Sequence, residues 1–173
     1  MDLRYPIGRF SHPGPVTAAE VEGWIAEMAA LPDEMRRVVS PLTQAQLDTR
    51  YRPGGWTLRQ VVHHVPDSHL NSYIRFKWAL TEEEPAIKTY FEERWALLED
   101  YRLVPVEASL DFLAALHLKL TTLLRSLDPD QLSRTLLHPE LGRVRLDWYV
   151  GFYAWHGRHH LAHITTTVER HGW

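Results

Sequence analysis

Residues 109–127, SLDFLAALHLKLTTLLRSL, place leucines at spacings of three and four positions. This spacing follows one face of an α-helix, because each turn holds 3.6 residues. Asp111 favours the amino end of such a helix, and the pair Asp128-Pro129 ends the pattern. We therefore predict a helix that starts near Ser109 and turns its leucine face to a core. That face consists of Leu110, Leu113, Leu116, Leu120, Leu123, Leu124 and Leu127.

A capping box marks the start of the first helix along the chain. Thr17 can cap the helix while Glu20, three residues later, reaches back to the backbone of Thr17. The pattern behind this box runs towards Pro32. Because a proline interrupts the backbone hydrogen bonds, residues 33–39 either continue the helix or form a separate turn, and both alternatives stay open. The prolines before Thr17 predict an extended N-terminal arm.

A second capping box, Thr57 with Gln60, follows the turn-forming residues 53–55 and predicts another long helix that ends before Pro85. Pro66 stands inside this pattern, where a helix former such as alanine is expected. A proline there removes one backbone hydrogen bond and should kink the axis, at a cost of about 3 kcal/mol if nothing compensates. The path of the helix after Pro66 is therefore open.

The last long helical pattern begins at Leu146 or Asp147. Four such patterns, without a convincing run of alternating strand residues, predict an all-α protein and most simply a four-helix bundle. There is no low-complexity segment and no Gly/Ser linker. We predict a single domain that covers residues 1–173.

Composition narrows the classes of function. A formal net charge of −3 offers no basic surface for nucleic acid. The start of the chain lacks the apolar stretch of a signal peptide, and no apolar run is long enough to cross a bilayer, so we expect a cytoplasmic protein without a membrane partner. The absence of cysteine agrees with a reducing compartment and rules out a protein thiolate as nucleophile or metal ligand.

Histidines are concentrated in the last helical pattern. Residues 155–164, WHGRHHLAHI, contain two pairs four positions apart, His156 with His160 and His159 with His163. Residues at this spacing lie on the same face of a helix, so either pair could bind one ion. The first pair shares its face with more apolar residues, but a polar helix face rich in histidine explains the pattern without any metal.

A third ligand for such an ion would come from another helix. His63, His64 and His69 form the only other dense histidine group, and facing helices of a bundle can direct side chains to one interior point. Three neutral imidazoles leave one position of a tetrahedral ion open, as in catalytic zinc sites. Residues outside such a set have simpler roles. We expect His63 to be exposed or to support a ligand, His69 and His163 to be surface or packing residues, and His117 and His138 to satisfy buried polar groups.

Three separated motifs resemble the DinB-like family, and specifically its YfiT branch of metal-dependent hydrolases. They are YPIGRF near the start, PGGWTLRQVVHHVPDSHLNSYIRFK in the second long pattern, and YAWHGRHHLAHI near the end. Their order and spacing agree over nearly the whole chain. The resemblance implies a four-helix bundle with a central divalent ion, held by His64, His156 and His160.

The same resemblance implies nickel or zinc as the ion and a homodimer as the assembly. It also implies two activities. One is S-transfer, in which a small thiol such as bacillithiol is joined to an electrophile such as an epoxide or an antibiotic. The other is hydrolysis of a small substrate. Because the chain has no cysteine, any thiol must come from outside.

For hydrolysis the ion would activate water, and a carboxylate would act as general base. Asp67 is the nearest candidate along the chain. Asn71 and Arg75 continue the face of His64 and could bind a polar or anionic group of the substrate, although solvent-exposed positions explain them equally well. A further alternative is a non-catalytic metal site in a dimerisation module.

Since protons compete for imidazole near pH 6.5, metal binding should weaken in acid.

Overall fold

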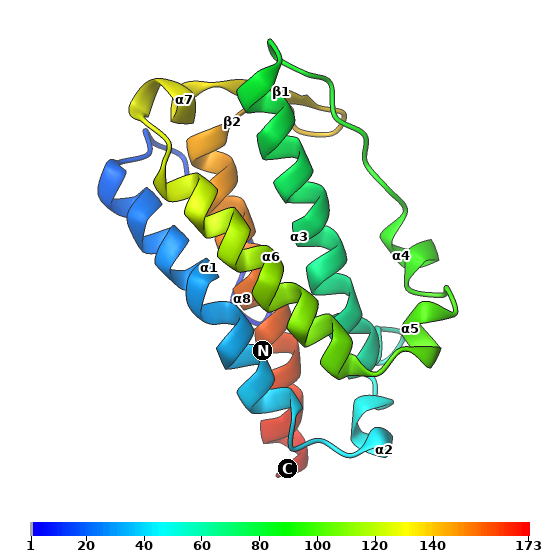
Figure 1. Cartoon of the computed structure of the whole chain (residues 1–173). Coiled ribbons are helices and arrows are strands. Elements are labelled where there is room, and N and C mark those ends of the chain that lie inside the picture. Colours follow the sequence, from blue (N-terminus) through cyan, green and yellow to red (C-terminus); the bar gives the residue numbers. More distant parts are fainter. Residues whose placement is uncertain (1) are drawn as a thin grey trace.

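Four long helices lie side by side in the computed structural model, which describes residues 2–173 (Figure 1). The predicted all-α architecture and the four-helix bundle are confirmed. The bundle is formed by α1 (Ala18–Val39), α3 (Leu58–Thr81), α6 (Val106–Arg125) and α8 (Leu146–His171).

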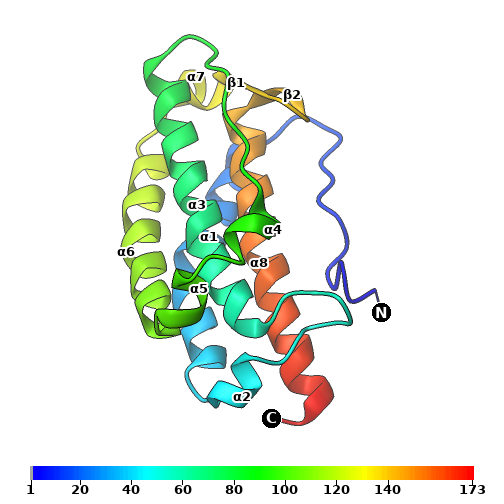
Figure 2. The ribbon, with the colours of Figure 1, turned by 90° about the vertical axis from the view of Figure 1, so that its right-hand side faces the viewer.

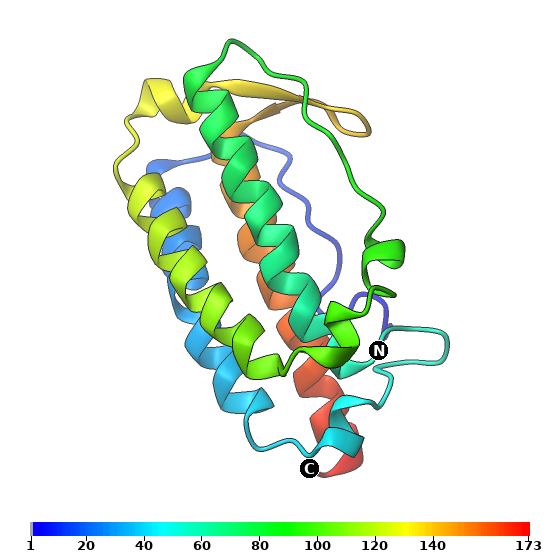
Figure 3. The same ribbon diagram turned by 45° about the vertical axis from the view of Figure 1, so that its right-hand side comes forward.

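The order of the helices around the bundle differs from their order along the chain. α1 packs against α6 and α8, and α3 packs against the same two helices, so α1 and α3 occupy opposite corners. α3 and α6 run in the same direction, because residues 82–105 return along the outside of the bundle (Figure 3). This returning segment carries α4 (Glu92–Trp95) and α5 (Asp100–Leu103). From the N-terminus the arm runs upward beside α8 and leads into the start of α1, as Figure 2 shows.

Local sequence signals fix where the helices begin. Both predicted capping boxes form, at the starts of α1 and α3. α6 begins at Val106, earlier than the predicted Ser109, with Pro105 as its cap. The two interior prolines do not end their helices: α1 continues through Pro32 to Val39, and α3 continues through Pro66. Both prolines are buried, so packing in the bundle compensates for the lost backbone hydrogen bonds.

The shorter elements lie at the two ends of the bundle. α2 (Gln44–Leu47) precedes α3, and α7 (Pro129–Ser133) follows α6. Next come two antiparallel strands, β1 (Thr135–His138) and β2 (Gly142–Arg145), which the sequence did not predict. Each strand has four residues, which is too short for an alternating pattern to stand out.

The buried core has two apolar halves. One half contains Ile25, Phe76, Leu120 and Val150, and the other contains Met35, Val61, Leu113 and Ile164. On α3, α6 and α8 the residues between these halves include fully buried histidines. The long helices therefore hold a polar layer between two apolar ones.

Gly157 allows α8 to approach α1 at this level. A Cβ at this position would overlap Cδ2 of Leu31, which is itself buried. We expect Gly157→Ala to destabilise the protein by about 1–2 kcal/mol, since the overpacking outweighs the better helix propensity of alanine. Gly23→Ala is the matched control, because a Cβ at Gly23 meets nothing within 4 Å. We expect this variant to gain stability in urea unfolding, and equal behaviour of the two variants would contradict the packing argument.

Candidate metal centre

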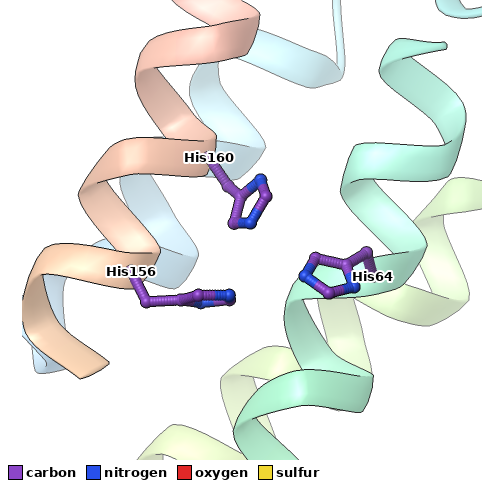
Figure 4. Close-up of side chains that lie close together, drawn as sticks. All are labelled: His64, His156 and His160. Atoms are coloured by element: carbon purple, nitrogen blue, oxygen red, sulfur yellow. The ribbon is translucent and has the colours of Figure 1, made fainter. Parts of the chain in front are cut away.

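His64 on α3 faces His156 and His160 on α8 (Figure 4). Each residue offers one ring nitrogen, and these three nitrogens lie within 4.8 Å of one another. The ring of His64 is centred 5.4 Å from that of His156 and 4.7 Å from that of His160. The i, i+4 spacing on α8 brings the other two rings to 4.5 Å. The structure thus brings together the three predicted ligands.

The three nitrogens fit a small divalent ion. Zinc bonds imidazole nitrogen at 2.0–2.1 Å, so a tetrahedral site needs nitrogens separated by about 3.4 Å. Small rotations of the three rings would bring their nitrogens to this separation. Nε2 of His64 and Nδ1 of His160 are buried without a hydrogen-bond partner among the described residues. Imidazole suits zinc and nickel, and the set leaves a position open for a further ligand.

Burial keeps these imidazoles neutral. Burial, together with the smaller effect of the nearby rings of His159 and His163, lowers the pKa of His64 to about 3. Burial also places the pKa values of His156 and His160 well below the ordinary value. Neutral imidazole carries the lone pair that binds a metal, so all three side chains are in the ligand form at neutral pH.

Trp56, in the turn before α3, packs against two of the three histidines. Its ring is centred 4.6 Å from that of His64 and is stacked 6.2 Å from that of His160. The indole Nε1 donates a hydrogen bond of 2.9 Å to the carboxylate of Glu93, which lies in α4. This carboxylate lines the same cavity as His156 and His160, although it is far from them in the sequence.

The second pair on α8 does not converge with His64. His159 stacks on Trp155 with ring centres 4.7 Å apart. His163 stacks on Tyr51 at 4.1 Å, and its Nε2 lies 3.3 Å from the carbonyl oxygen of Arg4. These contacts make the pair a packing surface for the N-terminal arm and the loop before α3.

The other predicted site residues lie in different surroundings. Asp67 is half-buried and accepts a hydrogen bond of 2.7 Å from the hydroxyl of Tyr101. Burial raises the pKa of Asp67, and the hydroxyl of Tyr101 opposes this change. The amide of Asn71 donates to the backbone carbonyl of Asp67. Neither side chain lines the cavities beside His156.

Arg75, by contrast, lies in a cavity that reaches His156. The residue is only 5% exposed. Its guanidinium donates to the hydroxyls of Tyr149 and Tyr153 and to the carbonyl oxygen of Lys88, at 3.1, 3.3 and 2.8 Å. Within residues 2–173 no carboxylate forms an ion pair with it. A buried cation with only neutral partners suits an anionic ligand.

Two cavities meet at His156. The first, of about 640 Å³, opens on His156 and His160, and the second, of about 470 Å³, contains Arg75. Charged side chains of both signs line the first cavity. They are Arg4, Arg9, Arg52, Glu92, Glu93 and Glu140.

The fold agrees with the comparison with known proteins. The family model of the DinB superfamily matches residues 9–164. The chain belongs to the DinB superfamily. The resemblance found in the three sequence motifs is thus confirmed. Within the described chain, no helix is long and apolar enough to span a bilayer.

Relatives in this superfamily match the chain over almost its full length. A protein of Bacillus mycoides (strain KBAB4) is 55% identical over 172 residues, which is 99% of both chains, and a protein of Bacillus cereus (strain 03BB102) is 54% identical over the same length. Both carry the name "Putative metal-dependent hydrolase". The solved structure of YfiT from Bacillus subtilis, described as a probable metal-dependent hydrolase, is 44% identical and superposes with a TM-score of 0.97 over 100% of this chain and 99% of its own.

Several residues around the DinB-type site carried no prediction of their own. Glu93 lies in the returning segment, where no helical or motif pattern marks it. Arg4 and Arg9 belong to the N-terminal arm, and the motif YPIGRF that contains Arg9 gave no role. His69 is fully buried against His156, and His63 is also buried, so His63 is not the exposed residue that one alternative proposed. The one sequence signal for these buried histidines is that His63, His64 and His69 lie close together in the segment that forms α3.

Proposed function

We propose that this chain is an enzyme that depends on one divalent ion, zinc or nickel, held by His64, His156 and His160. The observation that carries the proposal is the convergence of three buried, neutral imidazoles next to a cavity of about 640 Å³. Purely structural zinc sites use four protein ligands, whereas a three-ligand set leaves room for a reacting group. A non-catalytic dimerisation module would not need this cavity.

The ion, when bound, would lower the pKa of a thiol or a water molecule in its open position. The protein's own contribution is to hold the three imidazoles neutral and to pack Trp56 against His64 and His160. A reacting group in such a site interacts more strongly with nearby charges than it would in solution.

We infer that the reacting group is the sulfur of a small thiol of the bacillithiol type. This sulfur forms a bond to an electrophile, so that the whole thiol is joined to it. Asp67 was predicted as the base for hydrolysis, but its carboxylate accepts a hydrogen bond from Tyr101. A thiol that releases its proton to solvent as it binds would need no such base. The arginines and glutamates of the first cavity suit a cosubstrate that is larger than water and carries charged groups. Arg75 would bind an anionic group of either substrate.

Hydrolysis is the second candidate. The names of the relatives favour it, and so does Glu93, whose carboxylate is held by Trp56 beside the histidines. Such a carboxylate could accept a proton from water as general base. In this alternative Glu93 takes the role that the sequence assigned to Asp67.

The two candidates predict different effects of one pair of substitutions. We expect zinc- or nickel-loaded protein to accelerate conjugation of bacillithiol to a reporter electrophile, most clearly below the pKa of the free thiol, where solution thiolate is scarce. Asp67→Asn and Glu93→Gln should retain most of this rate, and removal of the ion should abolish it. Ester and amide substrates are assayed in parallel.

Hydrolysis of an ester or amide, together with a loss of about 10²–10⁴-fold in Glu93→Gln, would instead establish the second candidate. The same loss in Asp67→Asn would restore the base that the sequence suggested. Failure to conjugate bacillithiol, glutathione or cysteine to any electrophile would overturn the transferase assignment. The homodimer remains a separate prediction, which sedimentation of the loaded protein tests.

A further inference from the structure

Three buried imidazoles form a continuous hydrogen-bonded chain through the middle of the bundle. Nδ1 of His156 lies 3.2 Å from Nε2 of His69, and Nδ1 of His69 lies 2.9 Å from Nε2 of His117. Nδ1 of His117 lies 2.5 Å from the carbonyl oxygen of Met28. His156, His69, His117 and Met28 belong to α8, α3, α6 and α1, so the chain joins all four long helices.

The direction of every hydrogen bond in this chain follows from its last member. A carbonyl oxygen only accepts, so Nδ1 of His117 carries the hydrogen and Nε2 of the same neutral ring accepts. Nδ1 of His69 must then donate, which leaves Nε2 of His69 as the acceptor. The hydrogen of His156 therefore lies on Nδ1, and its Nε2 carries a free lone pair.

This assignment requires three neutral rings, and the surroundings support that state. His69 and His117 are 0% and 1% exposed. No described carboxylate forms an ion pair with any of the three rings. A buried imidazolium without a counter-charge would be strongly unfavourable. The hydroxyl of Ser68 lies 3.4 Å from Nε2 of His156, where it can donate to the lone pair.

We propose that His69 and His117 are positioning residues that hold His156 in the tautomer able to bind the ion through Nε2. The proposal rests on the metal site inferred above. A free neutral histidine side chain favours the opposite tautomer, with the hydrogen on Nε2, and that hydrogen would block the bond to a metal. The chain removes this competition and fixes the ring plane at the same time.

The three ligands are supported unequally. Among the described residues the chain ends at His156 and does not extend to His64 or His160. The position of the chain explains why a polar layer divides the apolar core: the layer supports one ligand from the far side of the bundle. Its members stand on α3 and α6 at positions that would otherwise be apolar.

The first test compares zinc affinity in His69→Leu, His117→Leu and His63→Leu by competition with a chelating dye. His63 is the matched control, because it is also buried on α3 and hydrogen-bonded, but to Ser109 outside the chain. We expect the dissociation constant to rise by roughly 10–100-fold in the first two variants and little in the control. His69→Gln keeps one donor and one acceptor and should recover part of the affinity. Unchanged affinity in folded His69→Leu would overturn the proposal.

The second test measures the unsubstituted metal-free protein and uses a variant only to assign signals. Nitrogen NMR of the histidine rings distinguishes protonated from unprotonated nitrogens, and His156→Ala identifies the signals of His156. We expect hydrogen on Nδ1 of His156, and hydrogen on Nε2 would contradict the chain. If the wild-type protein binds no zinc while His156 has the expected tautomer, the metal site fails and the hydrogen-bond assignment stands.

Discussion

Replacing His156 with alanine is expected to reduce the bound zinc or nickel from about one ion per chain to almost none. Removal of one of three imidazoles leaves only His64 and His160, and two ligands hold an ion far more weakly than three. His64→Ala and His160→Ala should behave in the same way. Metal content is measured by mass spectrometry after dialysis of the loaded protein, and circular dichroism checks that the helices persist.

His163→Ala is the control for this experiment. His163 is on the same helix and is buried, but it stacks on Tyr51 and does not face His64. We expect this variant to keep its ion. Full metal content in His156→Ala would remove the assignment of the three ligands. Loss of the ion in His163→Ala would move the site to the other pair on α8.

The sequence was sufficient for the four long helices and for the two candidate histidine pairs on the last of them. The leucine period of α6 and the capping boxes of α1 and α3 depend on neighbours along the chain, and such signals survive in a single sequence. The i, i+4 pair on α8 is equally local. The choice between His156/His160 and His159/His163 needed the partner helix, which the family resemblance supplied.

The surroundings of the site were less accessible from the sequence, because they depend on contacts between distant segments. Asp67 is three residues from His64, yet its carboxylate is bonded to Tyr101 of α5. Glu93 approaches the site only because residues 82–105 return along the bundle and because Trp56 donates to it. No periodicity along the chain encodes either contact.

The position of His69 shows the same limit. A histidine among polar neighbours on α3 suggested a surface or packing residue, and the structure gives it full burial in a layer between two apolar halves. Its two hydrogen-bond partners lie 48 and 87 residues away along the chain. A buried polar group needs such partners, but only the fold shows which residues supply them.

Acid is expected to unfold the metal-free protein between pH 6.5 and about 4. Burial lowers the pKa of His64 to about 3 and that of His117 to about 4, whereas both have ordinary values near 6.5 in the unfolded chain. Below pH 6.5 the unfolded state therefore binds more protons than the folded state, and stability falls with the pH until the folded pKa values are reached. At pH 5 these two residues together lower the free energy of unfolding by about 4 kcal/mol. This is a large part of the 5–15 kcal/mol that is typical of a domain.

The experiment measures the free energy of unfolding in urea from pH 7.5 to pH 4.5, with the ion removed. His117→Gln should reduce the slope of the free energy of unfolding against pH below pH 6.5. The expected reduction corresponds to one proton, about 1.4 kcal/mol per pH unit. His171→Gln, at an exposed position, should leave this slope unchanged. The loaded protein should stay folded to lower pH, because the ion binds only the folded state. Burial also delays the proton competition for the ligands, so metal affinity should hold below the pH of 6.5 that the sequence suggested. A free energy that does not change between pH 7 and pH 5 would mean that these histidines are not buried as neutral rings.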